Sequence, residues 1–553
     1  MAAPFLPTEM LFRIFSLLDR ASNARNARVC KSWTEAALDR VWKELDDWTV
    51  PLTHSIPTAK LSPPWNEVLF ERPFVATDWN VLLANAHRVR TIGNTHNICI
   101  DWSENAWQQI QRTCPTGQVF PNLKCLRGDF RVRSFPDFLM HGSVFELHLF
   151  CYLESFLYEN SEVRHIAKRL ANLTSLTLEA ELETEGDSMD MEEACGFVAS
   201  FTKLETLVIP LYSFYGNAVK CLSTMGSLRT ITVDPTKILA SRGAHWPFEN
   251  MKAMPVLFHG AFPSLQELSF GSSLACAQTF LADAHFPAPS LRSLWLRATD
   301  LDSTIINDTT PRALRDLLRL LADKFSSLEQ LEIIMNPVGS YTGEDFQMLP
   351  IDFADISSIT LFKSLTSFVL RHAHPIKASD EDIESLASQW PTLKKLILNP
   401  YPSFPSEPIL SRRALISFAD HCLNLRELGL YIQTAATPLP LRSAFDFSDR
   451  RFARLSVLNL GYSKYDPKER PALCRFLFRL LPDGWCNLRT NMMDGKGASE
   501  DLDEPDGFGT RSAEKLSALE FWPTIEEMLK LMAEVKEEGE RVQRSELRAA
   551  NRR

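Results

Sequence analysis

The sequence predicts an α/β protein, with a small N-terminal bundle of three helices, an irregular α/β solenoid and a C-terminal helix. Three observations carry this prediction. Apolar residues at helical spacing crowd the first stretch of about 45 residues. A leucine-anchored unit then recurs along the chain. Amphipathic stretches with helix-start residues separate its copies, so strands and helices are expected to alternate.

The first helix of the bundle is expected to begin at Pro7 or Thr8. Intervals of three and four place one apolar set on a single helix face: Met10, Leu11, Ile14, Phe15, Leu17 and Leu18. A second helix is expected after Ser22, and a third carries Trp33, Ala37, Val41 and Trp42. Helices this short enclose few side chains, so we expect the bundle to need a partner protein or the next domain for stability.

This segment resembles an F-box over residues about 4 to 46. The resemblance rests on Leu6-Pro7, on the spaced apolar residues that follow, and on Val29-Cys30-Lys31-x-Trp33; Ala24 departs from it, because the family usually has leucine there. The resemblance implies binding to the adaptor Skp1 and, through it, to a cullin in a ubiquitin ligase. The contact or supporting residues that it implies are Leu6, Pro7, Ile14, Phe15, Leu18, Val29 and Trp33. Judged from the residues alone, each could equally belong to the bundle's own core.

The recurrent unit is an apolar residue, two further residues, and then Leu-x-x-apolar-x-apolar. Eleven full copies occur and, with one partial copy, their anchor leucines run from Leu123 to Leu455 at a mean spacing of about 30 residues. The position three before the anchor is aromatic in seven copies: Phe120, Phe201, Phe262, Phe325, Phe362, Trp390 and Phe452. We expect these rings to pack beneath the next helix. Helix starts are expected at Thr310-Pro311, at Ser379 with Asp382 as a capping box, at Ser411 and at Pro471.

One strand and one helix per unit resemble a leucine-rich-repeat solenoid, in which a parallel sheet lines the concave side and helices the convex side. The spacing is uneven and reaches 37 residues, and asparagine at the position typical of such repeats is nearly confined to Asn336. We therefore expect an irregular horseshoe. An F-box before degenerate repeats resembles F-box proteins of mushroom-forming fungi, as does the segment Trp79 to Arg90.

The predicted segments are 1–47 (F-box), 48–119 (linker and N-terminal cap of the solenoid), 120–481 (solenoid), 482–512 (flexible acidic loop) and 513–553 (C-terminal helix). The last helix is expected to start at Trp522-Pro523, to end near Arg548, and to cap the final repeat through Ile525, Met528, Leu529 and Met532. The acidic stretch 179–193 is interpreted as a solvated loop, with a site for a basic partner as the alternative.

Composition narrows the functional classes. The 59 Lys+Arg against 69 Asp+Glu give a formal net charge of −10, whereas nucleic-acid binders usually carry a basic excess, so no nucleic-acid partner is expected. No signal peptide or membrane-spanning run is expected either. Eleven scattered cysteines without a C-x-x-C motif favour reduced thiols in the cytoplasm or the nucleus.

The chain shows no nucleophile elbow, phosphate-binding loop or H-E-x-x-H motif, so we expect no catalytic residues, metal or cofactor. His372-x-His374, with Asp380 nearby, supplies too few ligands for zinc and is interpreted as surface histidines after a strand. Core-filling roles are expected for Cys30, Cys125, Cys195 and Cys422.

Recognition is expected on the concave sheet, where alternate strand residues point. The candidates are Arg127, Thr177, Glu267, Trp295, Arg297, Gln330, Glu332, Arg371, Lys395, Glu427 and Tyr431. Those named for binding a target protein are Trp295, Arg297, Glu332, Arg371, Lys395 and Tyr431. The sequence thus predicts a non-catalytic substrate-recognition subunit of a Skp1-cullin-F-box ubiquitin ligase. The alternatives are a scaffold that acts without ubiquitin transfer and, less favoured, an enzyme with an unrecognised site.

Overall fold

The computed structural model describes residues 7–53, 56–60, 68–93, 102–115, 118–129, 137–152, 166–181, 191–209, 214–233, 254–298, 310–335, 349–434, 451–482, 486–489 and 513–550. Leu6 and most of the two predicted acidic segments lie outside these residues. The chain divides into two compact units, the first formed by Met1–Asp234 with Phe262–Ser264, and the second by Leu265–Arg553 with residues 254–261.

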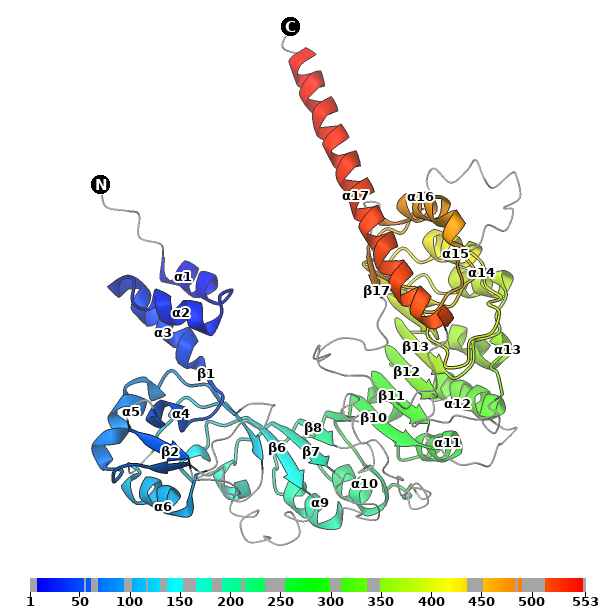
Figure 1. Ribbon diagram of the computed structural model, residues 1–553. Helices are drawn as coiled ribbons and strands as arrows, with labels where there is room; N and C mark the ends of the chain where they lie inside the picture. Colours follow the sequence, from blue (N-terminus) through cyan, green and yellow to red (C-terminus); the bar gives the residue numbers. More distant parts are fainter. Residues whose placement is uncertain are drawn as a thin grey trace. The chain divides into compact units, whose positions relative to one another are not determined.

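The first unit begins with three short helices, α1 (Thr8–Phe15), α2 (Arg20–Asn26) and α3 (Lys31–Lys43) (Figure 1). Three helices were predicted, but α2 begins at Arg20 rather than after Ser22. Pro7 is the N-cap of α1, where its missing N–H costs no hydrogen bond. Asp19 caps α2 by accepting from the backbone N–H of Ser22 at 2.7 Å. Asn23 is buried and donates to the carbonyls of Phe15 and Leu18, which fixes the end of α1 against α2.

Between the bundle and the repeats lies a cap with its own aromatic core. Its elements are α4 (Val50–Thr53), the antiparallel pair β2 (Thr58–Lys60) and β3 (Val68–Phe70), the 3-10 turn η1 (Ala76–Trp79), α5 (Asn80–Ala86) and α6 (Glu104–Thr113). Trp48 stacks on Trp79 at 6.1 Å between ring centroids, and Phe138 stands edge-on to both. This packing ties the segment 48–119 to the first repeats.

The strands of the first unit form a parallel sheet. In order, they are β1 (Glu44–Leu45), β4 (Thr91–Ile92), β5 (Cys125–Asp129), β6 (Glu146–Tyr152), β7 (Ser175–Glu181), β8 (Thr206–Ile209) and β9 (Thr230–Val233). One buried residue from each of six strands lies in register across this sheet: Ile92, Leu126, Leu147, Leu176, Leu207 and Ile231. The remaining elements are the 3-10 turn η2 (Asp137–Leu139) and the helices α9 (Met191–Ala199) and α10 (Gly216–Ser223).

The second unit repeats the arrangement with β10 (Glu267–Ser272), β11 (Ser293–Ala298), β12 (Gln330–Met335), β13 (Ser367–His372), β14 (Lys395–Leu398), β15 (Glu427–Leu430), β16 (Val457–Asn459) and β17 (Asn487–Arg489). Its helices α11 (Leu274–Ala282), α12 (Thr310–Lys324), α13 (Phe353–Ile356), α14 (Asp380–Gln389), α15 (Arg413–His421) and α16 (Arg470–Leu480) lie along one side of that sheet (Figure 1). Short 3-10 turns complete it: η6 (Ala288–Ser290), η8 (Ser357–Leu361) and η9 (Pro467–Glu469).

The repeat pattern is confirmed in its packing. The anchor leucines from Leu123 to Leu455 are buried, and so are the seven aromatic residues that precede them by three positions. Phe325, for example, lies 5.6 Å from Phe286 between ring centroids, in the layer behind the sheet. The predicted capping box is also present, because Ser379 Oγ accepts from the N–H of Asp382 and the Asp382 carboxylate accepts from the N–H of Ser379.

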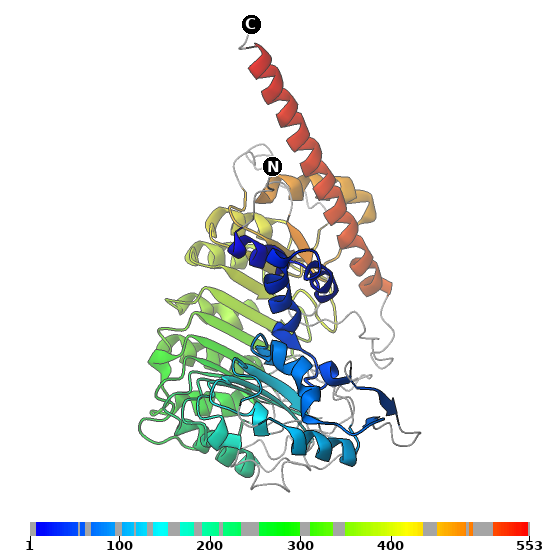
Figure 2. The same cartoon turned by 90° about the vertical axis from the view of Figure 1, so that its left-hand side faces the viewer.

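The C-terminal helix α17 (Ala513–Ala550) begins earlier than predicted and contains Pro523 in its interior. Its cap role is confirmed, since Ile525 and Leu529 are fully buried. Trp522 Nε1 donates to the carbonyl of Gly461 at 2.9 Å, and Phe521 stacks on Tyr465. The later part of α17 projects away from the repeats (Figures 1 and 2).

Candidate protein-interaction surfaces

The N-terminal bundle has a very small core of its own. Its buried apolar side chains are Leu11, Phe15, Ala36 and Ala37. Phe15 meets Trp33 edge-on at 5.5 Å between ring centroids, and Trp33 is half-buried. Of the residues implied by the F-box resemblance, these two therefore support the bundle from within.

The other described residues of that set lie on the surface. Pro7 is exposed, and the exposed fractions of Ile14, Leu18 and Val29 are 40%, 41% and 61%. Met10 and Leu17 share this exposure at 49% and 83%, and were not singled out in the sequence, although the helical spacing had already placed both on the apolar face. Met10, Ile14, Leu17, Leu18 and Val29 are called the apolar face of the bundle below. Several large apolar side chains exposed within one short segment are typical of a docking surface.

The bundle is joined to the solenoid through both backbone and side chains. Helix α3 leads directly into β1, which pairs in parallel with β4, and the N–H of Arg90 donates to the carbonyl of Lys43 at 2.8 Å. Arg88, 8% exposed, reaches back to α3 and forms ion pairs with Glu35 at 2.5 Å and with Asp39. The guanidinium lowers the pKa of the Glu35 carboxyl, chiefly by hydrogen bonding to it.

A family model for F-box-like domains matches residues 3–47. The chain carries an F-box-like domain. Behind the F-box, the parallel strands and alternating helices form a leucine-rich-repeat-like solenoid.

Solved structures similar to the chain include a leucine-rich-repeat-containing protein. The TLR13–ssRNA13 complex aligns over 71% of this chain and 55% of the other, with 16% identity and a TM-score of 0.36. LegL7 from Legionella pneumophila aligns over 59% and 87%, with 15% identity and a TM-score of 0.30. The yeast Rad7 and Elc1 complex aligns over 78% and 91%, with 14% identity and a TM-score of 0.34. The chain thus spans about half the length of the TLR13 chain. No curated protein matches it.

On the open face of the second sheet, the predicted target-binding residues fall into three rows. Trp295 and Glu332 are direct register partners and both are half-buried. Lys395 pairs with Glu427 at 3.2 Å in the row that begins each strand. Arg297 and Arg371 share the third row, on either side of Ile334. The half-buried members of the predicted site are therefore Trp295, Glu332, Arg371 and Lys395.

Two of the predicted anchors are not exposed. Tyr431 is 5% exposed, because its hydroxyl donates to the carbonyl of Ser406 at 2.6 Å beneath the loop after β14. Arg297 is 8% exposed. The row that contains Trp295 and Glu332 continues into Val369 and Ile397, which are also buried. Strand alternation predicted the face correctly, but it could not predict which parts of that face neighbouring loops cover.

The histidine pair was also misjudged, because His372 is fully buried rather than on the surface. His372 Nδ1 lies 3.0 Å from both the backbone nitrogen and the carbonyl oxygen of His374. Asn399, held at φ +47°, donates from its amide to the carbonyls of both histidines. Burial lowers the pKa of His372 to about 4, so the ring is neutral near pH 7.

The nine cysteines whose side chains the structure describes are free thiols. Cys125, Cys195 and Cys422 are buried as predicted, whereas Cys30 is exposed and the expectation of a core role was wrong for it. Cys30 is the N-cap of α3, and its thiol lies 3.1 Å from the hydroxyl of Ser32. Within the described residues, no helix is long and apolar enough to cross a membrane.

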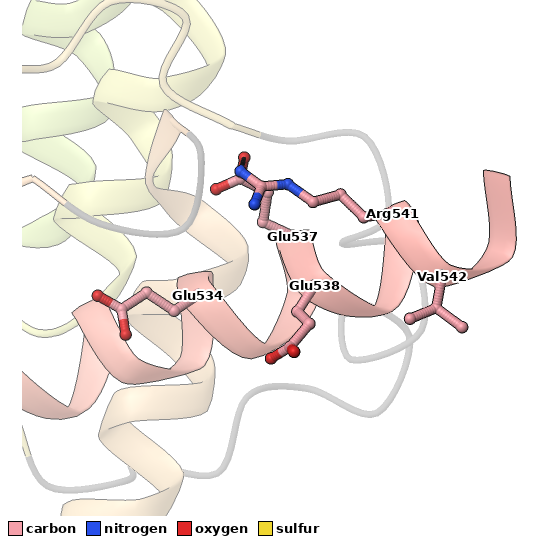
Figure 3. A pocket seen from close by; sticks show the side chains of 5 residues that line it. All are labelled: Glu534, Glu537, Glu538, Arg541 and Val542. Atoms are coloured by element: carbon pink, nitrogen blue, oxygen red, sulfur yellow. Dashed lines mark hydrogen bonds and ion pairs between the residues drawn. The ribbon is translucent and has the colours of Figure 1, made fainter. Parts of the chain in front are cut away.

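A hollow along α17 lacks the features of a binding site. Its lining consists of Glu534, Glu537, Glu538, Arg541 and Val542 (Figure 3). All five come from one helix, and Arg541 pairs with Glu537 at 2.6 Å as an exposed i,i+4 pair. No second element contributes polar groups to the lining. The hollow therefore lacks the set of polar groups that converge on a ligand in a binding site.

Proposed function

We propose that the chain is the substrate-recognition subunit of a Skp1-cullin-F-box ubiquitin ligase. In this role, the F-box binds a Skp1-like adaptor, and through it a cullin, while the solenoid binds a target protein. The observation that carries the proposal is the apolar face of the bundle. This face exposes five large apolar side chains, on α1, in the segment after it and just before α3, whereas the buried core of the bundle holds four apolar side chains. Burial of this face by partner helices would supply the apolar contacts that the bundle lacks.

The junction with the solenoid supports a positioning role. Arg88 and the β1–β4 pairing fix α3 to the first strands, so an adaptor bound to the F-box would be held in a fixed position against the first sheet. Such a subunit would act by proximity, raising the effective concentration of target lysines near a partner's activated ubiquitin. No chemical step is assigned to this chain.

For the target, we propose the open sheet face around Trp295 and Glu332, with Arg371 and Lys395 at its margin. Tryptophan and arginine are the residue types that most often dominate binding energy at protein interfaces. Trp295→Ala is expected to weaken target binding while leaving adaptor binding unchanged. Equal target recovery with the wild type and Trp295→Ala would contradict this placement.

Adaptor binding can be tested by introducing charge on the apolar face. Ile14→Asp and Val29→Asp are expected to abolish co-purification of a Skp1-like adaptor, because each would bury an unpaired carboxylate in the interface. Leu423→Asp is the matched control, because Leu423 is 57% exposed but lies after α15 in the second unit. Leu6→Ala with Pro7→Ala, and a variant lacking residues 1–47, should also lose the adaptor. Retained binding in these variants would refute the F-box role.

Ligase assembly is a separate question, addressed by affinity purification and mass spectrometry. The ligase proposal expects both an adaptor and a cullin with the wild type, and neither with the variant lacking residues 1–47. Recovery of the adaptor without any cullin would favour the scaffold that acts without ubiquitin transfer.

The proposed setting is the cytoplasm or the nucleus of a fungus. The free thiols and the resemblance of Trp79 to Arg90 to fungal F-box proteins support it. Microscopy of the tagged chain tests the compartment, and secretion would contradict the proposal.

A further inference from the structure

The first sheet brings together a thiol, a carboxylate and an imidazole. Cys125 on β5 and Glu146 on β6 are register partners, and His148 follows Glu146 by two residues on the same face of β6. Each of the three offers one potential ligand atom: the Cys125 Sγ, a Glu146 carboxylate oxygen and a His148 ring nitrogen. Among the described residues, these atoms form a group in which all lie within 4.8 Å of one another. Leu126, Leu147 and Leu149 point the opposite way into the core, so the group lies on the open face of the sheet.

The group is part-buried and internally bonded. Cys125 is 5% exposed, and the side chains of Glu146 and His148 are 40% and 21% exposed. His148 Nε2 lies 2.6 Å from Glu146 Oε1, and Arg127 Nη2 lies 3.8 Å from the same oxygen. Arg127 Nε is buried and makes no hydrogen bond. The guanidinium and the imidazole thus gather around one carboxylate without satisfying every buried donor.

We propose that Cys125, Glu146 and His148 form a zinc-binding site on the first sheet, with a water molecule in the fourth position. Thiolate, imidazole and carboxylate together are the donor set that Zn²⁺ takes, and three protein ligands with one open position is a recognised zinc arrangement. A tetrahedral ion bound at about 2.0–2.3 Å needs its ligand atoms about 3.5 Å apart, so small side-chain rotations bring the three donors onto one ion.

Binding displaces one proton. The Cys125 thiol loses its proton to solvent as its sulfur binds the ion, because the thiolate is the form that ligates zinc. Arg127 must turn aside as the ion enters, which its 33% exposed side chain allows. The site is independent of the proposed ligase role, because none of its residues lies in the F-box.

The test uses the full chain, freed of metal with a chelator and then titrated with Zn²⁺ against an indicator, and with Co²⁺ followed by absorption. The wild type is expected to bind one ion with a thiolate-to-cobalt charge-transfer band. Cys125→Ser removes the band, and His148→Gln weakens Zn²⁺ binding by at least about 100-fold, the upper end of the loss seen for groups that only support ligands. Arg127→Gln, which removes a competing cation, tightens binding by about tenfold.

Cys221→Ser is the matched control for adventitious binding. Cys221 is a half-buried free thiol on α10, outside the proposed ligand set, so its replacement tests for chance capture of the ion by another cysteine. This variant should bind Zn²⁺ as the wild type does. Thermal unfolding with and without Zn²⁺ gives a second readout, because the ion should raise the midpoint of the wild type and of Cys221→Ser but not of His148→Gln.

Two results would overturn the proposal. One is equal Zn²⁺ affinity in the wild type and in both Cys125→Ser and His148→Gln, with circular dichroism showing that the variants are folded. The other is loss of the ion in Cys221→Ser, which would place it elsewhere.

Discussion

Replacing Arg88 with alanine is expected to loosen the attachment of α3 to the cap of the solenoid. The Arg88 side chain is 8% exposed and holds Glu35 and Asp39, with further hydrogen bonds to the carbonyl of Glu35 and to Asn85 Oδ1 at 3.3 Å. Breaking a buried pair from one side costs about 3–5 kcal/mol when the remaining charge stays buried. Here both carboxylates reach water, so we expect about 2 kcal/mol from Arg88→Ala, including the lost packing of the arginine stem.

Hydrogen–deuterium exchange measures this loss locally. If α3 exchanges through detachment from the cap, about 2 kcal/mol corresponds to roughly 30-fold faster exchange of its amides. Arg20→Ala is the control, because Arg20 and Asp46 form an exposed pair at 3.5 Å that contributes little. Equal protection of α3 in the wild type and Arg88→Ala, or equal loss in both variants, would refute the role given to Arg88.

Three further predictions concern the second unit. Gly461→Ala should lower the free energy of unfolding by about 1–3 kcal/mol, because the residue has φ +46° and an added Cβ would lie 2.0 Å from a carbonyl oxygen; Gly226→Ala, in open space, should be tolerated. Leu529→Ala should cost about 2–5 kcal/mol and the 60% exposed Leu531→Ala under about 0.5 kcal/mol, both measured by urea unfolding. His372, with its pKa lowered to about 4, should make stability fall as the pH drops from about 6.5 to 4, by about 3 kcal/mol in total, a loss that His372→Asn removes.

Each of these has a contrary outcome. Equal midpoints for the alanine variants of Gly461 and Gly226 would show that the turn at Gly461 tolerates a side chain. Equal losses at Leu529 and Leu531 would contradict the packing of α17. The histidine argument rests on the unfolded chain binding a proton that the folded chain excludes, so a pH profile shared by the wild type and His372→Asn would contradict it.

Much of the fold followed from local pattern. The three helices of the bundle, the capping box at Ser379 and the buried aromatic residues of the repeats were predicted, because helix caps and hydrophobic periodicity act over a few neighbouring residues. The start of α2 was misplaced, because the helix begins at Arg20 rather than after Ser22. The start of α17 was predicted wrongly. Proline is common in the first turn of a helix, so Pro523 indicated a helix start, but Pro523 lies within α17. Tertiary contacts of Phe521 and Trp522 hold the helix before that proline, and the buried side chains of Ile525 and Leu529 hold it after the proline.

The sequence by itself determined the F-box, the repeat period and the side of each strand that faces the core, since all three depend on spacing along the chain. The tertiary structure alone decided exposure and proximity. Tyr431 is buried where its hydroxyl donates a hydrogen bond to the backbone carbonyl of Ser406, 25 residues earlier. Cys125 meets Glu146 and His148 only because β5 and β6 pair in one register out of several possible ones. Such contacts join residues far apart in the chain, where no local spacing rule applies.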